Sequence, residues 1–187
     1  TYAKANHQAE KGVLELADEN FTVVVLRQAT VFGHSPRMRF DLAINGMTYG
    51  AWANRKVPLM RDGSQWRPMI HVLDAVEAHI FMLNLERHLV NGQIFNTGSS
   101  KNNFQLGVLA KKVASIVGED VSIDLYGNTD NRSYEVSFDK IERLGFKAKY
   151  EIEKGVREIL LRLEQGKLTK TDKTITLQWY KNLVEWN

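Results

Sequence analysis

Residues 62–79 read DGSQWRPMIHVLDAVEAH, and three kinds of local structure meet within this stretch. Residues 62–64 (DGS) have the composition of a turn. Residues 69–72 (MIHV) form a short apolar run after a proline, which predicts an edge strand or the start of a strand. Asp74 and Glu77 have the spacing of a capping box, so we expect a helix to begin at or near Asp74. The stretch therefore predicts a loop, a strand and a helix in succession.

Arg67 lies where this predicted loop meets the strand. Its guanidinium has the geometry to form two parallel hydrogen bonds with a phosphate or a carboxylate. The alternative is a structural arginine that binds a helix end or a surface carboxylate, and spacing alone favours that alternative.

Composition narrows the class of protein. The 187 residues are 43% hydrophobic and 25% charged, which fits a single globular unit over residues 1–187 with a real core. Absence of cysteine excludes disulfides and agrees with a reducing compartment, so we expect a cytoplasmic protein. The apolar runs are far shorter than the roughly 20 residues of a membrane span. A net charge of +3 with interleaved signs argues against nucleic acid, and the five histidines lack metal-ligand spacing.

Hydrophobic periodicity predicts alternating helices and strands, which is typical of an α/β fold with parallel strands. The predicted helices cover residues 2–17, 39–53, 74–87, 104–117, 139–144, 152–163 and 172–185. The predicted strands cover residues 21–26, 57–60, 69–72, 92–96 and 121–125. We expect residues 21–26 (FTVVVL) to be buried on both faces of a sheet. A second capping box, Asp139 with Glu142, opens the helix that Gly145 ends, and the last helix carries Trp179, Leu183 and Trp186.

Three polar loops that carry arginine follow or precede apolar strands, at residues 28–39, 63–67 and 127–132. If these strands lie side by side in one sheet, the loops meet outside its carboxyl ends, where open α/β sheets bind ligands. Several arginines in one place suit a diphosphate. A glycine-rich phosphate loop and a G-x-S-x-G elbow are both absent from the sequence.

The order of these pieces resembles the C-terminal half of the NAD-dependent epimerase/dehydratase family, the extended short-chain dehydrogenases that act on nucleotide sugars. The matching segments are YAKANHQAE (2–10) with Y-x-x-x-K-x-x-x-E, LRQATVFG (26–33) with L-R-x-x-N-x-Y-G, residues 62–74 with G-D-G-x-x-R-D-F-x-x-V-x-D, NTG (96–98) with N-x-G, and DKIERLGF (139–146) with D-x-x-K-x-x-x-L-G-[WF]. The resemblance implies the C-terminal portion of a Rossmann-type fold: its last parallel strands and the small α/β substrate-binding region. The family's dinucleotide-binding half is missing from the sequence.

The resemblance implies a catalytic role for Tyr2, which falls at the position of the family tyrosine that exchanges a proton with the sugar hydroxyl. Tyrosine hydroxyls ordinarily titrate near pH 10, and the family lowers that value with a lysine four residues on. Asn6 occupies the lysine position and cannot supply a positive charge. Lys4 lies on a different side of the helix and is a poor substitute.

The resemblance also implies binding residues. Tyr2 and Gln28 are expected to contact the cofactor, NAD or NADP. Most of the cofactor contacts are expected from the family's N-terminal half, which is missing from the sequence. The residues expected to contact the nucleotide sugar are Thr30, Arg37, Arg39, Asn45, Arg67 and Arg132. A purely structural role is the alternative for two of the residues in this segment: Arg39 could simply begin its helix, and Asp41 could simply cap it.

We therefore expect part of an NAD(P)-dependent nucleotide-sugar epimerase or dehydratase, a homodimer when full length, with the 187-residue chain inactive by itself. The rival hypothesis is a non-catalytic relative, a sensor or scaffold, that has lost the Tyr-Lys pair. A plain interaction module is a third reading.

Overall fold

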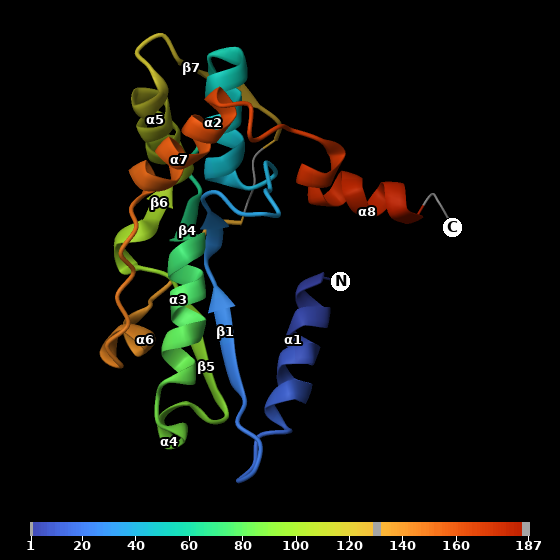
Figure 1. Ribbon diagram of the computed structural model, residues 1–187, viewed down its shortest axis with the longest axis vertical. Helices are drawn as coiled ribbons and strands as arrows, with labels where there is room; N and C mark the ends of the chain where they lie inside the picture. Colours follow the sequence, from blue (N-terminus) through green and yellow to red (C-terminus); the bar gives the residue numbers. More distant parts are fainter. Residues whose placement is uncertain (1, 129–131, 185–187) are drawn as a thin grey trace.

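The computed structural model describes residues 2–128 and 132–184 (Figure 1). Its helices are α1 (Tyr2–Leu14), α2 (Ala43–Asn54), α3 (Val72–Leu83), α4 (Arg87–Val90), α5 (Leu106–Val117), α6 (Asp139–Arg143), α7 (Ile152–Glu164) and α8 (Thr176–Val184), with 3-10 turns η1 (Ser100–Asn102) and η2 (Asp172–Thr174). Its strands are β1 (Val24–Gln28), β2 (Thr30–Phe32), β3 (Lys56–Met60), β4 (Trp66–His71), β5 (Gln93–Thr97), β6 (Asn103–Gln105) and β7 (Ser122–Tyr126).

The expected α/β class with parallel strands is confirmed. β1 pairs in parallel with β5, β2 with β4, and β3 with β7, while β6 adds to β4 in the antiparallel sense. These pairs belong to three small sheets. Of the strands that precede the three polar loops, β3 and β7 share one sheet, whereas β1 lies in another, so the condition that all three share one sheet is met only in part. β2 follows β1 after a single residue, Ala29, which carries the chain from one sheet to the next.

The strand predicted at residues 21–26 is shifted and less buried than expected. β1 begins at Val24, and its residues are partly or fully exposed, so burial on both faces was wrong. β2 lies inside the segment predicted to be a loop, and Phe104 belongs to β6 rather than to the helix that follows. Short strands of three residues carry too little periodicity to be recognised from sequence.

The predicted capping box at Asp74 was also wrong, because α3 begins two residues earlier. His71 is the N-cap, and its Nδ1 accepts the N–H of Leu73 at 3.2 Å. Asp74 is buried, and its carboxylate accepts the N–H groups of Lys149 at 2.8 Å and Tyr150 at 3.0 Å. The carboxylate thus fixes the chain that enters α7 instead of capping its own helix.

The second capping box fails for a similar reason. Asp139 is the first residue of α6, and its N–H donates to Ser137 Oγ at 3.2 Å. The carboxylate of Glu142 accepts hydrogen bonds from the N–H and Oγ of Ser100, at 3.3 and 3.4 Å. Gly145 does end this helix in a left-handed conformation, with φ 106°.

The helix predicted at residues 39–53 begins later, at Ala43, and the one predicted at 2–17 ends at Leu14. The last predicted helix divides into η2 and α8. Glu185 and Trp186, which were assigned to it, lie outside the described residues, as do residues 129–131 of the predicted loop.

The core has two main parts. One lies where α2, α5 and α7 pack against one another, with α2 and α5 also packed on β3. The other surrounds Phe95 of β5 and Phe138, between β5, α3 and α6. In Figure 1 the helices α2, α5 and α7 of the first part lie toward the top, and β5 and α6 of the second part lie toward the bottom.

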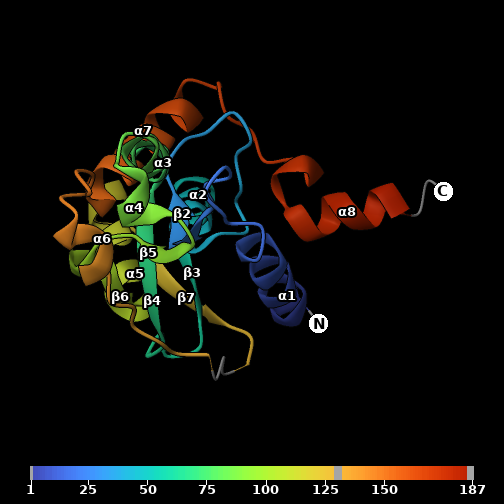
Figure 2. The same cartoon turned by 90° about the horizontal axis from the view of Figure 1, so that it is seen from below.

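Two helices lie at the periphery. α1 runs beside β1, and α8 projects away from the body in both views (Figures 1 and 2). Every residue of either helix keeps part of its surface exposed. On α3, Leu73, Val76, Ile80 and Leu83 are also exposed. In the described part of the chain, each helix is too short or too polar to cross a lipid bilayer.

Candidate functional site

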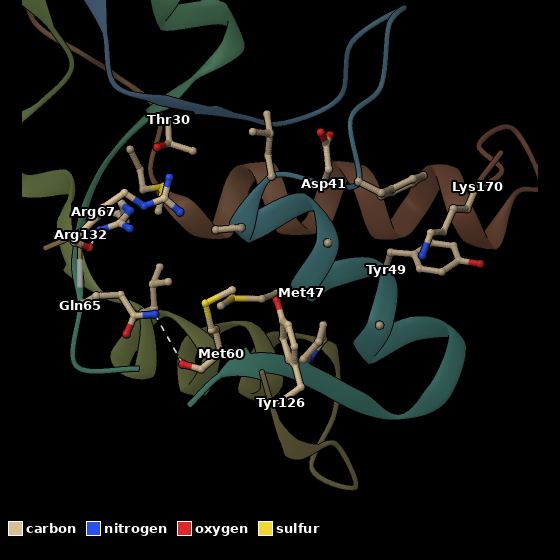
Figure 3. Close-up of a pocket in the computed structure, with 18 of the residues that line it drawn as sticks. Thr30, Asp41, Met47, Tyr49, Met60, Gln65, Arg67, Tyr126, Arg132 and Lys170 are labelled. Carbon is tan, nitrogen blue, oxygen red and sulfur yellow. Dashed lines mark hydrogen bonds between the residues drawn. The ribbon is translucent and has the colours of Figure 1, made fainter. Parts of the chain in front are cut away.

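A pocket of about 670 Å³ lies between α2, the strands β2, β3, β4 and β7, and the segment after α7 (Figure 3). The labelled lining residues in Figure 3 are Thr30, Asp41, Met47, Tyr49, Met60, Gln65, Arg67, Tyr126, Arg132 and Lys170. Three of the sequence-predicted binding residues, Thr30, Arg67 and Arg132, therefore share one pocket. This convergence brings together three segments that are well separated in the chain.

The guanidinium of Arg67 is held by backbone and aromatic contacts. Its Nη1 donates to the carbonyl of Trp66 at 2.8 Å and also to the carbonyl of Arg132. The guanidinium carbon lies 5.2 Å from the centre of the Tyr134 ring, within the range of a cation–π contact. These contacts place Arg67 and Arg132 on one wall of the pocket, as Figure 3 shows.

Thr30 is the first residue of β2, opposite Met69 of β4 in the parallel register. Since β1 ends just before it, the hydroxyl of Thr30 lies at the carboxyl end of β1. Figure 3 shows the side chain near Arg67. Thr30 therefore lines the cavity on the side where Arg67 lies.

The other three predicted binding residues do not line this pocket. Asn45 is buried, where its Oδ1 accepts the N–H of Gly33 and its Nδ2 donates to the carbonyl of Arg39, both at 3.0 Å. Arg37 is exposed. Arg39 forms a bidentate ion pair with Asp41, at 2.9 and 3.1 Å. The loop between β2 and α2 thus uses Asn45 and Arg39 to hold its own shape.

Asp41 lines the pocket as a charged group. Burial acts to raise the pKa of its carboxyl, but the hydrogen bonds and charge of Arg39, with the N–H of Thr176, outweigh burial and lower that pKa below its usual value. The carboxylate stays ionised and is paired with Arg39. The negative charge of Asp41 is therefore balanced by Arg39, which does not line the pocket.

Tyr2 and Asn6 lie one turn apart on α1 and are exposed, Tyr2 by 81%. The helix is tied to β1 by Arg27, whose guanidinium binds Glu10 at 2.6 Å. Gln28 Nε2 lies 3.3 Å from His79 Nε2. None of Tyr2, Asn6 and Gln28 lines the pocket that holds the arginines.

Within residues 2–128 and 132–184, His, Asp and Glu side chains form no group of three that could hold a metal ion.

The model of the NAD dependent epimerase/dehydratase family matches residues 1–98, which include α1, β1, β2, β4 and the site residues up to Arg67. The chain belongs to this family. Human dTDP-D-glucose 4,6-dehydratase is 25% identical over 198 residues, covering 99% of this chain and 49% of the human protein.

Solved structures of similar fold include UDP-glucose 4-epimerase from Thermotoga maritima, crystallised with UDP-glucose. It has 22% identity and a TM-score of 0.73, over 89% of this chain and 54% of that one. dTDP-glucose 4,6-dehydratase from Bacillus anthracis, in complex with NAD, has 23% identity and a TM-score of 0.64, over 78% and 45%. The chain thus has the Rossmann-type fold of the epimerase/dehydratase family and spans about half the length of the curated relatives it matches.

The family's name implies NAD, and the described residues of this chain do not fit a complete site for it. Tyr2, Asn6 and Gln28 all lie on exposed surface of α1 and β1, and none of them lines the pocket that holds Arg67. A dinucleotide needs an enclosing surface and phosphate-binding backbone, and these residues provide one side at most.

Sequence reasoning missed Tyr134, Tyr49 and Lys170 as pocket residues. Tyr134 had a usable signal, because it lies two residues after Arg132 and so shares its side of an extended chain. Tyr49 is hidden in the middle of a helix, and Lys170 reaches the pocket from the far end of the sequence. Neither could be assigned without the tertiary fold.

Proposed function

We propose that this chain forms the nucleotide-sugar-binding part of an NAD(P)-dependent epimerase or dehydratase. The observation that carries the proposal is the shared pocket of Arg67 and Arg132. Two guanidinium groups on one wall suit the two phosphates of a nucleoside diphosphate, since charge-assisted bidentate contacts are strong and directional.

The rest of the cavity supports the same ligand. A volume of about 670 Å³ lies within the usual range for small-molecule sites. Met47, Met60 and Tyr126 give the pocket an apolar floor in Figure 3, on which a flat nucleoside can pack. Thr30 adds a hydroxyl at the arginine end, where it is suited to a sugar hydroxyl.

The catalytic part of the proposal concerns Tyr2, which would accept or donate the proton of the sugar hydroxyl at its own Oη. Tyr2 is 81% exposed, and proton transfer would be more efficient if water were excluded from its hydroxyl when cofactor and sugar are bound. NAD or NADP would supply the hydride chemistry when bound.

A second candidate function, a non-catalytic nucleotide-sugar sensor or scaffold, rests on Asn6. An amide at this position supplies no positive charge to a neighbouring phenolate, so the usual means of activating the tyrosine is lost. The binding pocket is compatible with either function.

Turnover and binding together separate the two candidates. The full-length gene product is incubated with NAD or NADP and a panel of UDP- and dTDP-linked sugars, while calorimetry measures binding of the same ligands. Turnover of any member supports the enzyme. Binding that depends on Arg67 without turnover of any member supports the sensor, and lack of binding by all members contradicts both.

A further inference from the structure

The segment after α7, residues 165–176, is here called the C-terminal strap. It is fixed to the loop that precedes α2: the N–H of Phe40 donates to the carbonyl of Thr174 at 2.9 Å, and the N–H of Thr176 donates to Asp41 Oδ2 at 3.3 Å. Leu168 and Ile175 of the strap pack on the small core around Phe40. The strap is therefore a built wall of the pocket and not a loose tail.

Lys170 extends from this strap into the pocket lining. Its Nζ lies 5.0 Å from the centre of the Tyr49 ring, a cation–π contact that keeps the ammonium at the cavity. In Figure 3 the Lys170 and Tyr49 pair lies at the side of the pocket opposite to Arg67 and Arg132. The cavity thus has positive charge on two facing sides.

Among the described residues, no acidic side chain pairs with Lys170. Asp41 is the acidic residue that lines the pocket, and its two carboxylate oxygens are bound by Nε and Nη2 of Arg39. An ammonium with no protein counter-charge at a cavity attracts an anionic ligand.

We propose that Lys170 is a further binding residue that contacts the phosphate groups of the ligand from the side opposite to Arg67 and Arg132. The inference rests on the proposed function, because it assumes that the pocket takes a nucleoside diphosphate. The strap then completes the anion site, and the ligand's diphosphate is held between two cationic sides.

Calorimetric titration of the full-length protein with UDP and with dTDP tests this proposal, because both probes carry the diphosphate and lack a sugar. Lys170→Gln should weaken the better-bound probe about threefold to tenfold, since a partly exposed charged contact is of moderate strength. Lys170→Arg should retain affinity within about twofold, and the affinity of Lys170→Gln should depend less on salt.

The matched control is Lys173→Gln. Lys173 lies on the same strap and also contacts an aromatic ring, Trp179 at 5.2 Å, but does not line the pocket. The Lys173→Gln variant should bind UDP and dTDP with the same affinity as the parent protein. Thermal melting of all variants should coincide, which shows that the strap stays folded.

Equal affinity of Lys170→Gln and parent protein would overturn the inference, and so would an equal loss in Lys173→Gln. Failure of the proposed function looks different. In that case neither probe binds the parent protein at millimolar concentration, or binding is unchanged in Arg67→Ala. Binding that requires Arg67 but ignores Lys170 overturns this inference alone.

Discussion

The imidazole of His71 and the carboxylate of Glu158 form a hydrogen bond of 3.0 Å that joins β4 to α7. His71 is fully buried, and its Nδ1 accepts the N–H of Leu73, so the ring proton lies on Nε2 and is donated to Glu158. Glu158 also accepts the N–H of His34 at 2.6 Å. One buried histidine therefore caps α3 and ties that helix to α7.

We expect His71→Ala to lower the free energy of unfolding by about 2–4 kcal/mol. The variant loses the N-cap of α3, removes one of the two hydrogen-bond donors to Glu158 and opens a cavity beside Phe32. Urea unfolding followed by circular dichroism measures the loss. His88→Ala is the control, because His88 is 71% exposed and should change stability little; equal losses in the two variants would contradict this role.

Glu158 should make stability depend on acid. Burial acts to raise the pKa of this carboxyl, but the hydrogen bonds of His71 and His34, with the charge of Lys154, lower it below the ordinary value of 4.5. A carboxyl with a depressed pKa stabilises the fold above its unfolded pKa, and this stabilisation is lost as pH falls through the folded value. The stability difference between parent and Glu158→Gln should therefore shrink below about pH 4.5. A difference that stays constant down to about pH 3 would remove Glu158 from the acid response.

Asp74 and Glu77 should behave very differently, although the sequence pairs them. Asp74→Ala leaves the N–H groups of Lys149 and Tyr150 without their acceptor and should cost about 2–4 kcal/mol of unfolding free energy. Glu77 is exposed, so Glu77→Ala should stay within about 0.5 kcal/mol of the parent. A large loss of unfolding free energy in Glu77→Ala, measured by urea unfolding, would support the capping box that the sequence predicts.

Arg67→Ala should weaken nucleotide-sugar binding roughly tenfold to a hundredfold, because a charge-assisted contact to phosphate contributes about 1.5–3 kcal/mol. Arg67→Lys should recover only part of the affinity, since lysine lacks the bidentate fork. Calorimetry on both variants measures the effect, with Arg143→Ala as control because Arg143 is 81% exposed on α6. Unchanged affinity with a large drop in melting temperature would show that Arg67 is structural.

Tyr2 and Asn6 can be tested by activity in the full-length enzyme. Tyr2→Phe removes the hydroxyl that would carry the proton and should lower turnover at least about a hundredfold. Asn6→Lys restores a cation one turn away and should raise turnover at neutral pH, since a nearby positive charge favours the phenolate. Both variants are measured by initial rates with saturating cofactor. Full activity of Tyr2→Phe would exclude Tyr2 from the mechanism.

The fold class and most helices were predictable because periodic apolar residues determine them locally. α5, α7 and β3 agree with the predicted spans to within two residues at each end. Helix starts were harder. Asp74 has the spacing of a cap, but its carboxylate binds backbone groups 75 residues away, and sequence spacing does not reveal such a partner.

The pocket was predictable only in part. Thr30, Arg67 and Arg132 came from motif order, and the structure brings them together. Arg39 and Asn45 had equally good positions, yet their side chains satisfy the backbone and charge of their own loop. A polar side chain in such a motif can bind either the ligand or its own loop. Tertiary packing decides between the two, and the sequence motif does not reveal that packing.

The close approach of α7 to β2 has a consequence for how freely this protein can change during evolution. At Gly155 an added methyl group would lie 2.5 Å from the Phe32 ring, so α7 would have to move outward. The strap and Lys170 follow directly from the end of α7. A mutation to alanine at a buried glycine that touches no ligand is thus expected to widen the binding cavity, and drift in ligand preference can begin at a position remote from the cavity itself.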